Sequence, residues 1–339
     1  ITWGRDEMNL VELPFGPITP SGSKTLDVVH CVFDPILKRK VTRRTIITAS
    51  DAFGLPRPID DLVLVGMMAL TQEAGFRSPK VEFSVYQLCR IVGWPIDGRS
   101  YQRVEDSMSR IAGTTLQFRD AWYDKGEREF KSKTFHLIDE VDLRSRDQIE
   151  RARRRPTGQV ALSSFVWNQV IWKSFQDGYI RRLNMEMFRR IARGRRRDVP
   201  IRLFRILDKR FHRRSTAKFP LEQLAVGILG LSPRYAPSQM RRIINRAGDW
   251  LIKCGYLADY HYSDWESTKN AAVIFRKRQP RRRPGRQRLN PRLAKPRSNS
   301  AGGQERRAED ATWFSQKPEA AWRAIEDQAL EAAYGTELE

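Results

Sequence analysis

The chain has 339 residues, which is enough for about two domains, and 40% of them are hydrophobic, which is enough to build real cores. Lys and Arg number 62 against 40 Asp and Glu, and the formal net charge of +22 implies a polyanionic partner, either nucleic acid or an anionic membrane surface. The longest apolar run, at 62–70, is far shorter than the roughly 20 residues of a membrane span, so membrane binding explains the charge less well.

The cysteines favour a cytoplasmic protein. Cys31, Cys89 and Cys254 are isolated, match no zinc spacing and suit a reducing compartment. No signal peptide is visible in a chain that begins at Ile1. Residues 1–25 are rich in turn residues and predict an extended arm. Two strands are expected at 26–34 and 40–49.

The stretch 80–143, together with an amphipathic helix at 60–73 that Asp60 can cap, predicts a winged helix-turn-helix. Its expected elements are a strand at 80–83, helices at 84–91 and 100–112, a strand around 116–118, a hairpin at 124–129 and a strand around 135–141. In the second of these helices Tyr101, Val104, Met108 and Ile111 have helical spacing and form the buried side. A unit of this kind offers its last helix to the DNA major groove.

Residues 144–158 are polar and rich in arginine, which predicts an interdomain linker. The second half then repeats the plan. Helices are expected at 165–175, 185–192, 200–212, 221–228 and 237–254, and strands at 178–183, 218–220, 256–262 and 271–277. A basic loop at 193–197 and a polar wing at 263–270 complete the unit.

Residues 276–297 contain eleven Lys and Arg and no acid, and residues 301–339 are acidic overall, so we expect a tail that is mostly disordered, with a helix at 318–334. The predicted class is therefore α+β, with two winged helix-turn-helix domains in tandem and a disordered basic C-terminal tail. The predicted boundaries are 1–25 for the arm, 26–143 for the first domain, 144–158 for the linker, 159–278 for the second domain and 279–339 for the tail.

Of the two helices expected to face DNA, the one at 237–254 has the exposed side better suited to reading bases. Met240, Ile244 and Leu251 belong to its buried stripe, and the other side carries groups that bond base edges: Arg pairs with guanine O6 and N7, and Asn with adenine N6 and N7. A plain solvated face is the alternative there, and a dimer interface is equally plausible for the first unit. The predicted DNA-binding residues are Ser238, Gln239, Arg241, Arg242, Asn245, Arg246, Arg99, Gln102, Arg103, Arg110, Arg195, Arg196, Arg197, Lys269, Arg281, Arg282 and Arg283.

Two short segments resemble ATPase motifs. The run Gly22-Ser-Lys-Thr25 lacks the spacing of a phosphate loop and precedes a strand, and Leu137-Ile-Asp-Glu140 only looks like an acidic strand end. The histidines are scattered, with no metal-spaced pair. We therefore expect no catalytic residues, no metal and no cofactor. A nucleic-acid-dependent ATPase or nickase is the enzyme alternative.

Four runs carry a resemblance to a known family: Asp6-Glu-Met-Asn-Leu10, Ser50-Asp-Ala-Phe-Gly-Leu-Pro56, Gly93-Trp-Pro-Ile-Asp-Gly-Arg-Ser-Tyr101 and Asp208-Lys-Arg-Phe211. Up to about residue 278, the chain is similar to the plasmid-type replication initiator protein A of bacteria. This resemblance implies a protein that binds double-stranded plasmid origin DNA, helps to open it and recruits host replication proteins such as helicase or its loader.

More distant initiators with two winged-helix domains use the second for reading bases and the first for backbone contact or dimerisation. By this analogy we expect a homodimer through the first domain. A winged-helix transcriptional regulator is the remaining alternative, because it shares every DNA-facing feature.

Overall fold

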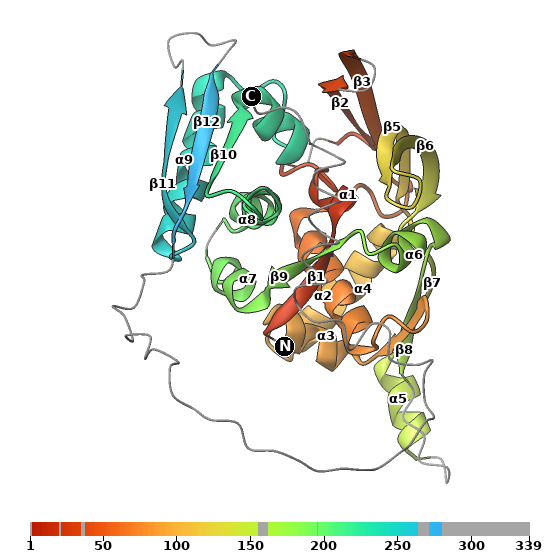
Figure 1. Ribbon diagram of the computed structural model, residues 1–339. Helices are drawn as coiled ribbons and strands as arrows, with labels where there is room; N and C mark the ends of the chain where they lie inside the picture. The colour runs from red at the N-terminus through yellow and green to blue at the C-terminus, as the bar shows by residue number, and fades with distance from the viewer. Residues whose placement is uncertain are drawn as a thin grey trace, which may run out of the picture.

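The computed structural model describes residues 2–19, 22–34, 38–154, 162–194, 196–263 and 271–279. In these ranges the fold is mixed α/β, and each recorded strand pair is antiparallel. The strands form one sheet of four strands, two sheets of three and one of two. The sheets lie around a pair of central helices, α2 (Pro58–Glu73) and α8 (Asp198–Arg210), as Figure 1 shows.

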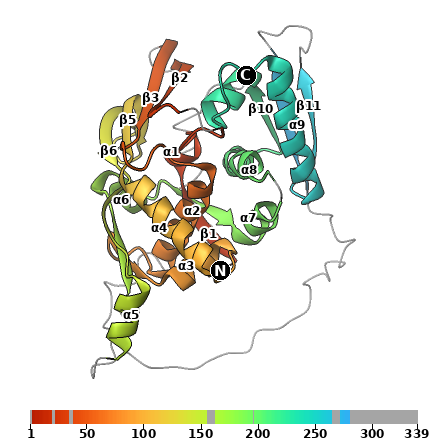
Figure 2. The same ribbon diagram turned by 180° about the vertical axis from the view of Figure 1, so that it is seen from behind.

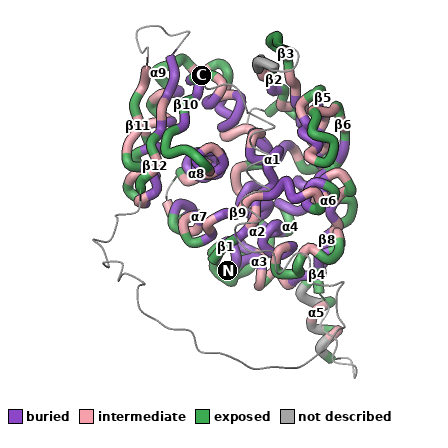
Figure 3. Tube along the Cα trace, in the orientation of Figure 1, coloured by how far each residue is buried: buried purple, intermediate pink, exposed green. Residues whose placement is uncertain are grey.

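The two central helices are buried over most of their length (Figure 3). Helix α2 begins with proline at position 58, two residues before the predicted start, so Asp60 lies in its first turn, where its Oδ2 accepts a hydrogen bond of 2.7 Å from the backbone N–H of Arg57 at the N-cap. Helix α8 buries apolar side chains such as Phe204 and Leu207, and it also buries the cationic Arg202, which bonds Asp61 of α2. A helix that is buried on all sides belongs at the centre of a fold.

The N-terminal unit consists of α2, β4 (Lys80–Phe83), α3 (Val85–Val92), α4 (Gly98–Ala112), β7 (Ile138–Asp142) and β8 (Ser163–Trp167). Helix α3 is capped by Ser84 and ends at Gly93, whose φ of +77° is a left-handed conformation that favours glycine. Helix α4 is capped by Asp97, whose Oδ1 accepts 2.7 Å from the Ser100 N–H. The predicted stripe of α4 is buried at Val104, Met108 and Ile111, and Tyr101 is half-buried.

The hairpin expected at 124–129 is present, and the sequence left its strand partners open. Strands β5 (Thr115–Asp124) and β6 (Glu129–His136) form it, and β5 also pairs with β3 (Arg39–Thr48), which pairs with β2 (Thr25–Asp34), in the order β2-β3-β5-β6. Strand β4 instead pairs with β8, and β8 pairs with β7. The alternating pattern identifies which side of a strand is buried, and it leaves the pairing partner open.

The predicted linker and the helix after it also differ from the structure. The segment 144–158 contains α5 (Arg146–Arg153) and connects β7 with β8, which are neighbours in one sheet. The predicted helix at 165–175 begins as the strand β8, and only α6 (Gln169–Gln176), capped by Asn168, is helical. The segment therefore closes a sheet of the first half, and the break between halves does not fall at 144–158.

The C-terminal unit follows the predicted order. After β9 (Ile180–Asn184) and α7 (Met185–Ala192), it consists of α8, β10 (Thr216–Pro220), the π-helix η1 (Gln223–Ile228), α9 (Pro237–Lys253), β11 (Leu257–Ser263) and β12 (Ala272–Lys277). The sheet order is β10-β12-β11, so β11 and β12 are the expected hairpin. The wing between them at 264–270 and the tail from 280, including the predicted helix at 318–334, lie outside the described residues.

The N-terminal segment is an integral part of the fold, where an extended arm was expected. Strand β1 (Trp3–Glu7) pairs with β9, and α1 (Met8–Val11) follows it. Asp6 receives two hydrogen bonds of 2.6 Å from the buried guanidinium of Arg205 on α8. One turn further along α8, the ammonium group of Lys209 donates 2.8 Å to the carbonyl of Met8. Two of the runs that carried the family resemblance, 6–10 and 208–211, are therefore in direct contact.

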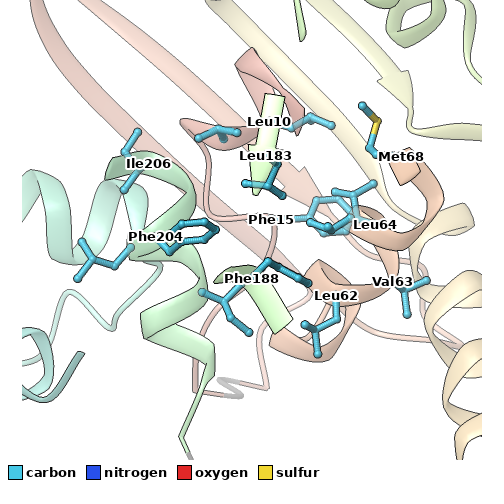
Figure 4. Close-up of a cluster of buried hydrophobic side chains, with 14 of the residues drawn as sticks. Leu10, Phe15, Leu62, Val63, Leu64, Met68, Leu183, Phe188, Phe204 and Ile206 are labelled. Carbon is cyan, nitrogen blue, oxygen red and sulfur yellow. The ribbon is translucent and has the colours of Figure 1, made fainter. Parts of the chain in front are cut away.

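One hydrophobic core extends through both halves. Figure 4 shows Leu10 from α1, Leu62 from α2, Leu183 from β9, Phe188 from α7 and Phe204 from α8 gathered in it. Such shared burial makes the two halves depend on each other for stability. No helix in the described ranges is long and apolar enough to cross a membrane.

Candidate nucleic-acid interface

Helix α9 is held by one side and leaves the other side exposed. It begins with Pro237, and the Gln239 Oε1 accepts a hydrogen bond of 3.0 Å from the N–H of Ala236 just before the helix. Met240, Ile244, Ala247, Gly248 and Leu251 are buried. This spacing of three and four residues fixes which side of the helix faces solvent.

The opposite side of α9 carries the exposed residues Ser238, Gln239, Arg242 and Arg246. All four were predicted there. Neither Arg242 nor Arg246 forms an ion pair with any described residue, so their charges are available to phosphate groups or base edges. The helix dipole adds a positive partial charge at the N-terminus of α9, close to Ser238 and Gln239.

Two other predicted residues of α9 lie at the border with β11. Asn245 is half-buried, and its Oδ1 accepts a hydrogen bond of 2.7 Å from the hydroxyl of Tyr262. The Arg241 guanidinium lies 5.7 Å from the centre of the same ring. Burial raises the pKa of Tyr262 to about 12, so its hydroxyl is protonated and donates at neutral pH.

Tyr262 was missed as a functional residue. Its sequence signal was the alternation of Tyr260 and Tyr262 on one side of a strand. Tyr260 also reaches α9, where its hydroxyl donates 2.9 Å to Asp249. The two tyrosines therefore join the hairpin to α9.

On helix α4 the prediction is only partly right. Arg99, Gln102 and Arg103 are exposed, and the Gln102 amide donates 2.9 Å to Asp106. Arg110 is buried and bonds Asp60, because the end of α4 on which it lies packs over the start of α2. Its assignment as a DNA contact is therefore wrong. The exposed side of α4 also carries Glu105 and Asp106, so its charge is mixed in sign.

The basic loop between α7 and α8 lies partly within the described residues. Arg196 is exposed, whereas Arg197 is half-buried and its Nη1 donates 3.3 Å to the carbonyl of Ala192. Gly194 in this loop lies against the ring of Trp250, where a Cβ would be 2.7 Å from a ring carbon. The loop therefore borders the C-terminal half of α9, away from Arg242. Five predicted residues lie outside the described ranges: Arg195, Lys269, Arg281, Arg282 and Arg283.

The structure does not bring the two predicted reader helices together. In Figures 1 and 2, α8 and α2 lie between α9 and α4. Each helix therefore belongs to its own surface, and the two surfaces can act separately. Among the described residues, no group of three or more His, Cys, Asp or Glu side chains is placed to hold a metal ion. Lys24, in the run similar to a phosphate loop, lies just before β2. Its Nζ is 2.6 Å from Oδ1 of Asp51.

Comparison with known proteins identifies the family. The model of the family "Replication initiator protein A" matches residues 5–252. The plasmid replication initiator protein TrfA of Escherichia coli is 28% identical over 90 residues, which are 26% of this chain and 23% of TrfA. The chain thus matches less than a quarter of the length of this curated relative.

The chain is also similar to solved structures. The crystal structure of domains 2 and 3 of RctB has a TM-score of 0.50 at 14% identity, over 80% of this chain and 99% of that one. The Pi initiator protein in complex with iteron DNA has a TM-score of 0.47 at 10% identity, over 81% of this chain and 97% of that one. Because the family match at 5–252 spans most of its length, the chain belongs to the replication initiator protein A family.

Proposed function

We propose that this chain is a non-enzymatic, cytoplasmic plasmid replication initiator that binds double-stranded origin DNA sequence-specifically. In this proposal its two units act as tandem winged helix-turn-helix modules, and the C-terminal unit places α9 in the major groove. DNA binding then helps to open the origin and brings in host replication proteins such as the helicase or its loader.

The observation that carries the proposal is the exposed side of α9. A buried stripe holds the helix in place, while Arg242 and Arg246 stand on the opposite side without a partner among the described residues. Arginine at such a position can bond guanine O6 and N7 together. Family membership and the net charge of +22 support the same ligand.

The N-terminal unit has a different role in this proposal. The acidic residues Glu105 and Asp106 on the exposed side of α4 repel phosphate, which disfavours α4 as a reader of the major groove and favours contact with a second copy of the chain, while the exposed Arg99 and Arg103 remain for backbone contact at the edge of the site. Sedimentation of the protein across a concentration series tests the homodimer. A sedimentation coefficient that stays at the monomer value at every concentration contradicts it.

A plasmid replication assay tests the function as a whole. A plasmid that carries the chain's gene with its flanking DNA should be maintained in a host that supports it, and a purified sample should retard a fragment of that flanking DNA in a gel. Retention of the fragment without plasmid maintenance would favour the transcriptional regulator. ATP hydrolysis or plasmid nicking by the purified protein, lost on Lys24→Ala, would favour the enzyme alternative.

A further inference from the structure

The hairpin strand β11 holds the side chains of α9 through two tyrosines. The hydroxyl of Tyr262 donates 2.7 Å to the Oδ1 of Asn245. The hydroxyl of Tyr260 donates 2.9 Å to Asp249 and 3.3 Å to the backbone carbonyl of Asn245. Gly248 permits this approach, because a Cβ there would lie 2.7 Å from the ring of Tyr260. Asn245 is thus the one predicted base-reading residue of α9 whose amide oxygen is engaged by a described side chain.

The bond from Tyr262 decides which half of the Asn245 amide is available. An amide has one oxygen, which accepts, and one NH₂ group, which donates. Reading adenine through N6 and N7 together requires both halves of the amide to face the base. Since the hydroxyl of Tyr262 engages Oδ1 and turns it toward β11, only the NH₂ group remains to point away from the hairpin.

We propose that Tyr262 is a positioning residue that makes Asn245 a donor-only reader of the major groove. This inference rests on the proposed function. An NH₂ group can donate to guanine O6 or N7, to thymine O4 and to adenine N7, whereas cytosine presents only the N4 amino donor. The protein therefore rejects cytosine at the position that Asn245 faces, and it gains no bidentate preference for adenine there.

Selection of binding sites from a random pool of DNA duplexes tests this, with the full-length chain. Wild-type protein should deplete cytosine at one position, by on the order of tenfold relative to the other three bases, without favouring adenine. Asn245→Asp keeps an acceptor for the Tyr262 hydroxyl and replaces the NH₂ group by an oxygen. This variant should turn the depletion of cytosine at that position into a preference for cytosine or adenine.

Tyr262→Phe keeps the ring and releases the amide, which can then rotate and accept from adenine N6. It should make adenine the favoured base at that position, through paired bonds to N6 and N7, and leave the other positions unchanged. Tyr260→Phe is the matched control, because it removes a hydroxyl from the same strand that bonds Asp249 and only the backbone of Asn245. This control should select the wild-type sequence.

The outcomes separate the inference from the proposed function. Identical selected sequences for wild type and Tyr262→Phe, or an unchanged preference in Asn245→Asp, would overturn the inference while leaving sequence-specific binding in place. A wild-type protein that enriches no common sequence at all would instead contradict the proposed function. A change in preference for Tyr260→Phe equal to that for Tyr262→Phe would assign the effect to the packing of the hairpin and overturn the positioning role.

Discussion

Arg110 on α4 and Asp60 on α2 are joined by two parallel hydrogen bonds of 2.8 Å, from Nε to Oδ2 and from Nη2 to Oδ1. Asp60 is fully buried, and its Oδ2 also accepts from the N–H of Arg57 at the start of α2. One carboxylate thus caps a central helix and anchors α4 to it. Arg110 acts in the stability of the fold, although its position in the sequence suggested a contact with DNA.

Arg110→Ala should destabilise the protein by about 3–5 kcal/mol, because it leaves the buried Asp60 carboxylate without its cation. Arg103→Ala on the same helix is the matched control. Since Arg103 is exposed, its loss should change the free energy of unfolding by less than about 0.5 kcal/mol. Urea denaturation of both variants measures the difference, and equal stabilities would contradict the structural role of Arg110.

Glu7 should make stability depend on pH. Burial is the main cause that raises the pKa of Glu7 from 4.5 to about 7, against opposing hydrogen bonds from Ser174, Leu10 and Asn9 and the charge of Lys209. A folded-state pKa above the unfolded value means that protonated Glu7 favours the folded state. Its contribution is full below pH 4.5 and is lost as the pH rises through about 7.

Glu7→Gln should remove this dependence. Between pH 4.5 and a pH above 7, the wild type should lose at most about 3 kcal/mol of unfolding free energy relative to the variant. Chemical denaturation of both proteins at pH 5 and pH 8 checks it. Parallel pH profiles for the two proteins would show that Glu7 is ionised in the folded state as readily as in the unfolded chain.

Gly227 in η1 and His30 in β2 join the four-stranded sheet to the C-terminal unit. A Cβ at position 227 would lie 2.5 Å from the Cε1 of His30, so Gly227→Ala should cost about 1–3 kcal/mol through overpacking. His30→Ala removes the ring that the new methyl group meets, and the double variant should recover part of the loss. A double-mutant cycle in unfolding free energy measures this, and strictly additive effects would exclude the contact.

The sequence allowed a good prediction of the helices and a poor one of the residues that meet across the fold. The apolar spacing in α4 and α9 predicted each helix and its buried side, and α8 was predicted as a helix. Helix α2 was expected to be amphipathic, and it is instead buried on nearly all sides. The burial of Arg202 and Arg205 could not be predicted, because their partners Asp61 and Asp6 lie 141 and 199 residues away in the chain. Charged residues at helical spacing look like a solvated face until such partners are known.

The boundary between β8 and α6 was missed for a different reason, which lies in the local sequence. The run from Phe165 continues without a break in composition from β8 into α6, and a short apolar run fits a strand and a helix equally well. For the candidate site, the exposed positions of α9 followed from its period, including Arg242 and Arg246. The hydrogen bond between Tyr262 and Asn245 joins a strand to a helix, and no pattern within α9 predicts it.

In the proposed function, α9 reads the DNA sequence and α4 does not. Footprinting of Arg242→Ala and Arg103→Ala on origin and random DNA, at one salt concentration, separates the two helices. Both residues are exposed, so both variants should unfold like the wild type. Arg242→Ala should lose about 1–3 kcal/mol on the origin site and much less on random DNA, and Arg103→Ala should weaken both evenly or leave both unchanged. Loss of site preference in Arg103→Ala, with preference retained in Arg242→Ala, would contradict the claim and assign sequence reading to the N-terminal unit.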